Sequence, residues 1–154
     1  MKCLCLFAWA FSFSGGTMKF IILSDSFYDR YINCTEMLQK RNRPYVCLEI
    51  RINGVVYAIP LRHHISHKYS FRTGVESGLD YTKAVVITES SDIGQYNARI
   101  DQAEYNTLKG KERSIAKGME NYIKLYKKSL AYPDNSHYAY IRSCSSLQYF
   151  EKYI

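Results

Sequence analysis

Three of the four histidines of the chain lie within five positions, in residues 62–68, which read RHHISHK. The unperturbed pKa of imidazole is about 6.5, so two adjacent histidines can act as general base and general acid near neutral pH. The flanking Arg62 and Lys68 are suited to a phosphate and to the negative charge of its transition state. These residue types match metal-free cleavage of RNA, in which the 2′-hydroxyl is the nucleophile.

The roles follow from the order of these residues. We expect His63 or His64 to take the proton of the 2′-hydroxyl, and His67 or Lys68 to assist the leaving oxygen. Arg62 would hold and neutralise the phosphate between them.

Three other interpretations of the histidines remain open. The order His-His-x-x-His differs from the His-Glu-x-x-His of metalloproteases, and no Cys-x-x-Cys accompanies it, so we expect no metal. The histidines can instead merely close a hairpin at the surface. We also expect one of them to face inward and pack, because alternation after a strand places His63 and Lys68 on a different side from His64.

A hairpin must position this segment. Residues 45–52 and 55–60 are rich in Val, Ile and Tyr, and Asn53-Gly54 between them is the preferred two-residue type I′ turn. We expect the second strand to stop at Pro60, which has no N–H to donate. The histidines would then lie in the loop at its exit, where scaffolds usually carry chemistry.

The other predicted elements mix strands and helices without alternation. Residues 20–23, 69–73 and 83–88 are strand-like, 74–78 form a turn, and Ser24 is placed to cap a helix over 27–33. A long helical stretch begins at Asp101, breaks near Gly110 and ends at 132–134, and two short helices start at Ser136 and Ser145. This order predicts a single α+β domain with a mostly antiparallel sheet and peripheral helices.

The long helix has two distinct faces. Its apolar face comprises Ile115, Met119, Tyr122, Tyr126 and Leu130, and the short terminal helices would dock through Tyr140, Ile141, Leu147, Tyr149 and Phe150. Its opposite face is basic and comprises Arg113, Lys117, Lys124, Lys127 and Lys128. Such a face is commonly a solvated surface, but together with Tyr122, Tyr126 and Tyr132 it can also grip RNA phosphates.

The composition agrees with an RNA partner and excludes several classes of protein. The chain has 154 residues, 47% of them hydrophobic, which allows a real core and excludes a disordered or collagen-like protein. Its net charge of +7 favours polyanions. The sequence contains no phosphate-binding loop, dinucleotide fingerprint or nucleophile elbow, so we expect no cofactor.

The first 17 residues differ from the rest. Their apolar run, residues 3–13, is too short to span a bilayer and resembles a signal peptide, but Met18 is also a plausible start of translation. The three later cysteines, Cys34, Cys47 and Cys144, are a poor disulfide framework. We therefore expect a cytoplasmic domain over 18–154, with 1–17 outside the fold and no membrane partner. A secreted basic protein is the alternative.

Several segments taken together resemble a known family. They are residues 57–68 (YAIPLRHHISHK), 78–87 (GLDYTKAVVI), 122–128 (YIKLYKK) and 146–150 (SLQYF), with 18–22 and 43–45 before them. They resemble the toxin of type III toxin–antitoxin systems, in particular the TenpN-like branch of the ToxN/AbiQ endoribonucleases. The resemblance covers 18–154 and leaves out 1–17.

The resemblance implies a compact fold with a strongly bent antiparallel sheet. It implies metal-independent, sequence-specific cleavage of RNA that leaves 2′,3′-cyclic phosphate and 5′-hydroxyl ends. It further implies inhibition by a small pseudoknot RNA antitoxin, closed toxin–RNA assemblies and a role in abortive defence against phage.

One departure affects the site. The ToxN branch ends the corresponding strand with Pro-Leu-Thr-Ser and has a lysine on the preceding strand, whereas this chain has Arg62-His63 and Arg43 at those places. We expect Arg43 to join Arg62 at the phosphate, and Lys83, at the head of a strand, to be a further contact. A non-catalytic RNA-binding protein is the main alternative.

Overall fold

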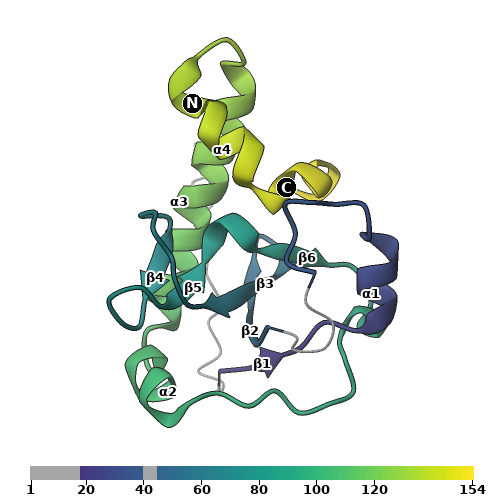
Figure 1. Ribbon diagram of the computed structural model, residues 1–154, viewed down its shortest axis with the longest axis vertical. Helices are drawn as coiled ribbons and strands as arrows, with labels where there is room; N and C mark the ends of the chain where they lie inside the picture. The colour runs from purple at the N-terminus through teal and green to yellow at the C-terminus, as the bar shows by residue number, and fades with distance from the viewer. Residues whose placement is uncertain (1–17, 40–44) are drawn as a thin grey trace, which may run out of the picture.

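The structure is a computed structural model that describes residues 18–39 and 45–154 (Figure 1). The described residues form a six-stranded antiparallel sheet with four α-helices and several 3₁₀ turns, so the predicted α+β class is confirmed. The paired order is β1-β2-β3-β5-β4, and β6 pairs with β3. The strands are β1 (Phe20–Ile21), β2 (Cys47–Ile52), β3 (Val55–Arg62), β4 (Ser70–Arg72), β5 (Gly78–Asp80) and β6 (Val85–Ile87).

The β2–β3 hairpin forms around the predicted turn. Asn53 and Gly54 have φ angles of 50° and 80°, as a type I′ turn requires. The expected end of the second strand at Pro60 is wrong, because β3 continues to Arg62. The missing N–H of Pro60 lies between the part of β3 that pairs with β6 and the part that pairs with β5, where no ladder bond is needed.

Strand β5 completes the sheet beside the histidine segment. Arg62 and Leu61 of β3 pair with Gly78 and Leu79 of β5, and β5 pairs in turn with β4. The chain between β3 and β4 is therefore a loop whose two ends enter the same part of the sheet. This small strand was not predicted, since three residues that include glycine show no strand pattern.

The helices begin where their capping residues predict. The Ser24 hydroxyl accepts from the Phe27 N–H at the start of α1 (Asp25–Arg30), which ends before the expected Asn33. Asp101 caps α2 (Gln102–Leu108) through the Ala103 and Glu104 N–H groups. Gly110, with φ of 76°, separates α2 from α3 (Glu112–Ala131), so the predicted break is confirmed.

Helix α3 packs on the sheet and then projects beyond it, where α4 (Ala139–Cys144) lies against it (Figure 1). Ile115, Met119, Tyr122 and Tyr126 are buried, as the helical spacing predicts. Leu130 is 40% exposed, contrary to expectation, because the helix has passed the sheet there, and the neighbouring Ser129 is the buried residue.

The C-terminal segment closes the core. Ile141, Leu147 and Phe150 are buried, but Tyr140 is 51% exposed, so its predicted docking role is wrong. Among the described residues, no helix combines the length and the apolar character needed to cross a membrane.

Candidate active site

The loop that follows β3 is attached to the sheet at several points. The Ile65 side chain is buried, and its N–H donates to the Glu76 carbonyl at 2.8 Å. The Arg72 guanidinium of β4 donates to the carbonyls of Ile65 at 2.9 Å and His67 at 2.6 Å. These bonds give the histidine loop, defined as residues 63–68, a fixed backbone path.

Asp80, at the end of β5, is fully buried, and its carboxylate is contacted from both sides of the loop's start, by Arg62 and by His67. It accepts hydrogen bonds from Arg62 Nη1 at 2.5 Å and from the Thr82 N–H and hydroxyl at 2.9 and 2.7 Å. His67 Nε2 lies 3.3 Å from Asp80 Oδ1. Burial acts to raise the pKa of Asp80, but the hydrogen bonds from His67, Thr82 and Arg62 outweigh it and hold the pKa below its ordinary value.

His67 is the inward-facing histidine. Its Nδ1 accepts the Tyr69 N–H at 3.2 Å, so the ring proton lies on Nε2 and points to Asp80. The side chain is 15% exposed, and both ring nitrogens are engaged. The expectation that one histidine packs inward is confirmed, and the same geometry argues against His67 as the proton donor to a leaving oxygen.

His63 and His64 are the exposed pair. The side chain of His64 is 91% exposed, and its Nδ1 lies 3.5 Å from Glu76 Oε2, which leaves Nε2 facing solvent. Its backbone has a φ of 62°, an uncommon conformation outside glycine that turns the chain sharply. His63 makes no hydrogen bond or ion pair with any described residue. Both imidazoles are therefore accessible to a substrate.

The two cations expected beside the histidines, Arg62 and Lys68, occupy different environments. Arg62 is partly exposed beside Asp80, at 24% for the side chain. Lys68 is exposed, with Nζ 5.6 Å from the centre of the Tyr69 ring. Arg43, the third expected group, lies outside the described residues.

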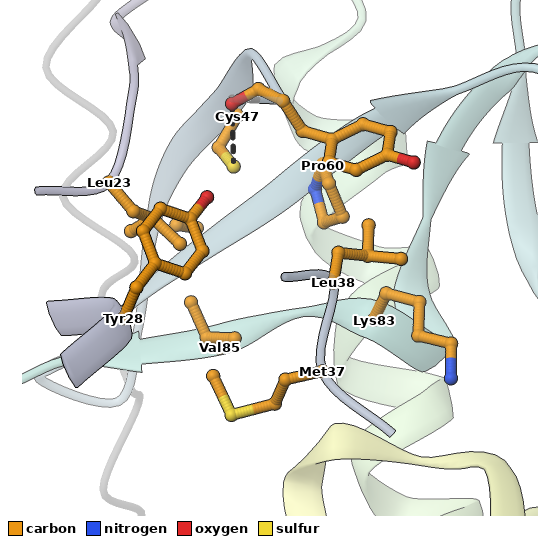
Figure 2. Close-up of a pocket in the computed structure, with 10 residues that line it drawn as sticks. Leu23, Tyr28, Met37, Leu38, Cys47, Pro60, Lys83 and Val85 are labelled. Atoms are coloured by element: carbon orange, nitrogen blue, oxygen red, sulfur yellow. Dashed lines mark hydrogen bonds between the residues drawn. The ribbon is translucent and has the colours of Figure 1, made fainter. Parts of the chain in front are cut away.

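Lys83, which was expected to contact a phosphate, has its ammonium bound by two backbone carbonyls instead. Its Nζ donates to the carbonyls of Glu36 and Cys144, both at 2.8 Å, and burial lowers its pKa. Figure 2 shows its stem next to Leu38 at the edge of a pocket, across from Leu23 and Tyr28, with the ammonium directed away. That pocket has a volume of about 10 Å³, room for about one water and for no larger ligand.

The cysteines are unsuited to nucleophilic chemistry. Burial raises the pKa of the Cys47 thiol to about 12, and burial also raises the pKa of Cys34 and of Cys144. All three are free thiols. A thiolate nucleophile is accordingly disfavoured at neutral pH.

The predicted basic face of α3 is present at the surface. Arg113, Lys117, Lys124, Lys127 and Lys128 are all exposed. Glu120 pairs with two of them, since its carboxylate lies 3.3 Å from Lys117 and 3.6 Å from Lys124. Tyr126 is not part of this face: it is 1% exposed and its hydroxyl donates to Glu151, so its expected stacking role is wrong.

Four residues that build the site are not evident from the sequence, namely Asp80, Thr82, Arg72 and Glu76. No local pattern in the sequence identifies them, because Asp80 approaches Arg62 only when β5 pairs with β3. Within the described ranges, no group of three or more His, Cys, Asp or Glu side chains is arranged to hold a metal ion.

Comparisons of the chain with protein-family models, with curated proteins and with solved structures find no match.

Proposed function

We propose that this protein is a metal-independent endoribonuclease, the toxin of a type III toxin–antitoxin system. The observation that carries the proposal is the exposed His63-His64 pair on an anchored loop, with Arg62 and Lys68 at its ends. The resemblance of residues 18–154 to the ToxN/AbiQ toxins points to the same chemistry.

His64 is the proposed general base. Glu76 faces Nδ1 at 3.5 Å, which favours the proton on that nitrogen and leaves Nε2 to take the proton of the RNA 2′-hydroxyl. Both side chains are exposed, so the pair orients the ring more than it stabilises the fold. The 2′-oxygen then bonds to phosphorus while the bond from phosphorus to the 5′-oxygen breaks. His63 or Lys68 protonates that oxygen, which gives a 2′,3′-cyclic phosphate and a 5′-hydroxyl.

Arg62 is the proposed phosphate ligand. A guanidinium has five N–H donors, and the contact with Asp80 uses only part of them. The remaining donors are suited to the phosphate oxygens, whose charge increases in the transition state. His67 contacts Asp80, and Asp80 holds the guanidinium of Arg62 in place. His67 is therefore a positioning residue.

The proposed partners are RNA molecules, and no cofactor is involved. The substrate RNA and a pseudoknot RNA antitoxin would both meet the exposed cations of α3, in a closed toxin–RNA assembly within the cytoplasm. Short tandem repeats followed by a terminator, upstream of the coding region, are expected to encode the antitoxin. We expect such a system to act in abortive defence against phage, as the resemblance implies.

The decisive experiment is end-mapping of RNA treated with the wild type and with His63→Ala and His64→Ala. At saturating RNA each variant should cut about 10²–10⁴-fold more slowly, the usual contribution of one general acid or base. His137→Ala removes the exposed histidine outside the loop and should cut at the wild-type rate. Cleavage should continue undiminished in EDTA.

Two results would contradict the proposal. If the His63→Ala, His64→Ala double variant leaves the same cyclic-phosphate ends at the wild-type rate, these imidazoles are not the catalysts. If the wild type binds RNA without cutting it, the non-catalytic RNA-binding alternative is correct.

A further inference from the structure

Residues 132–138, here called the tip, join α3 to α4 and project beyond the sheet (Figure 1). The guanidinium of Arg142 donates to the carbonyls of Ser129 at 2.8 Å, Tyr132 at 3.3 Å and Pro133 at 2.8 Å. One side chain thus ties the last turn of α3 to the turn that follows it. The tip has a defined shape although it lies beyond the sheet.

This tip exposes aromatic rings that the core does not use. Tyr132 is 55% exposed, and its ring centre lies 6.3 Å from that of Tyr138, with 32° between their planes. Tyr140, on the first turn of α4, is 51% exposed. The tyrosines lower on α3, Tyr122 and Tyr126, are buried, so exposure of rings begins only where the helix leaves the sheet.

The series of tyrosines ends at Tyr69, which adjoins the histidine loop and is half-buried. Helix α4, which carries Tyr140, ends against the segment that follows Asp80, because Lys83 Nζ donates to the Cys144 carbonyl at 2.8 Å. The ring of Tyr69 is 6.0 Å from that of His67.

Helix α3 sets the length of this path. The Tyr69 ring lies 5.7 Å from that of Tyr122, which precedes Tyr132 by ten residues, or roughly 15 Å along the helix axis. Tyr122 itself is buried, so the surface series consists of the tyrosines of the tip and α4 and the half-buried Tyr69, separated by a distance of that order.

Cations lie at both ends of this series. Lys127 and Lys128 are exposed at the tip end of α3 and form no ion pair with a described residue, unlike Lys117 and Lys124. Lys68 lies over the Tyr69 ring at the other end. Aromatic faces interleaved with unpaired cations fit a single nucleic-acid strand, whose bases are free to stack, better than a duplex, whose bases stack on one another.

We propose that Tyr132, Tyr138, Tyr140 and Tyr69, together with Lys127, Lys128 and Lys68, form an aromatic track that binds single-stranded RNA and leads it to the histidine loop. Binding along the track is independent of the proposed cleavage, and only the delivery of the strand to a reactive site rests on the proposed function.

The test uses a fluorescent 12-nucleotide oligouridylate with 2′-O-methyl sugars, which cannot be cleaved by 2′-hydroxyl attack. Fluorescence anisotropy should show that Tyr132→Ala and Tyr140→Ala each weaken binding about tenfold, whereas Tyr132→Phe, which keeps the ring, binds like the wild type. The control is Tyr96→Ala, since Tyr96 is 83% exposed on a segment next to α1 and should be neutral. The Lys127→Gln, Lys128→Gln variant should lower the slope of log Kd against log salt by about 1.4.

Some results of this test would contradict the proposed aromatic track. Unchanged affinity in the two alanine variants would overturn it, as would an equal loss in Tyr96→Ala. Self-association that Tyr132→Ala abolishes while RNA binding persists would assign the tip to a contact between copies of the chain. If the oligonucleotide binds as expected but unmodified RNA stays intact, the proposed cleavage fails and the track stands.

Discussion

At the residue scale, the site depends on an acid that the basic sequence motif does not contain. Asp80 is fully buried, and its carboxylate is contacted by Arg62, His67 and Thr82, which come from different parts of the chain. A buried carboxylate is tolerated only when its oxygens are satisfied, so the identity and direction of these donors are tightly constrained. The exposed pair His63-His64 is presented to solvent because their neighbours in the loop are held in this way.

Replacing this acid should weaken the fold in a pH-dependent manner. Asp80→Asn leaves Arg62 without its counterion, and we expect a loss of about 2–3 kcal/mol in the free energy of unfolding at pH 7. The pKa of Asp80 is lower in the folded protein than in the unfolded chain, so its stabilisation is present above about pH 4 and disappears as the pH falls through the folded-state pKa. Urea unfolding of wild type and variant from pH 7 to pH 3 measures the difference, which should shrink in acid.

Glu76→Gln is the matched control, because that carboxylate is 68% exposed and bears little on stability. A constant gap between wild type and Asp80→Asn at every pH would refute the linkage.

At the element scale, β5 joins the loop to the rest of the sheet. Gly78 pairs with Arg62 on one side and Arg72 on the other, so one small residue lies between the two cations that hold the site. A β-carbon at this position would lie 2.2 Å from the Phe71 carbonyl oxygen, and that oxygen belongs to backbone that cannot turn aside. The loop geometry therefore depends on the close approach of β4 and β5.

Gly78→Ala should separate β4 from β5 and loosen the histidine loop. We expect a loss of about 2–3 kcal/mol, with faster amide hydrogen exchange at Ile65 and Leu79. Gly110→Ala is the comparison, since a β-carbon there meets nothing within 4 Å and the cost of about 1–2 kcal/mol comes from the left-handed backbone alone. Equal exchange at Ile65 in both variants would show that β5 does not hold the loop.

At the scale of the whole molecule, tyrosine serves two purposes. Of the fifteen tyrosines, five lie in the core and others are displayed on the surface beside the cations. A phenol is large enough to fill a core and flat enough to stack on a base, so one residue type supports both the stability and the proposed RNA contact. The buried members are Tyr28, Tyr57, Tyr81, Tyr122 and Tyr126.

The buried phenols predict a sharp loss of stability in alkali. Burial raises the pKa of Tyr57 to about 12 and also raises the pKa of Tyr81, Tyr122 and Tyr126. The folded state keeps these protons above the ordinary tyrosine pKa of about 10, so their stabilisation is full below pH 10 and is lost as the pH rises through the folded-state values. Phenolate absorbance, followed together with circular dichroism, should show exposed tyrosines titrating near pH 10 and buried ones only as the fold is lost. Titration of all the tyrosines near pH 10 in the folded protein would contradict this.

Much of the fold could be predicted from local sequence, and the reason is that local conformation depends on neighbouring residues. The Asn53-Gly54 turn, the caps at Ser24 and Asp101 and the break at Gly110 each follow from the backbone preferences of one or two residues. The helical spacing of α3 likewise identified its buried face up to the point where the sheet ends. The class, the hairpin and the position of the histidine loop were thus determined by the sequence itself.

Tertiary structure decided the state of each side chain. His67 and His64 are chemically identical and three residues apart, yet one is bound to Asp80 and the other faces solvent. Lys83 and Tyr126 have residue types suited to RNA, but carbonyl groups and a carboxylate from distant segments bind them inside the fold. These outcomes depend on contacts between residues far apart in the chain, and a local pattern cannot specify such contacts, because the partner of a buried polar group is whichever segment packing brings to it.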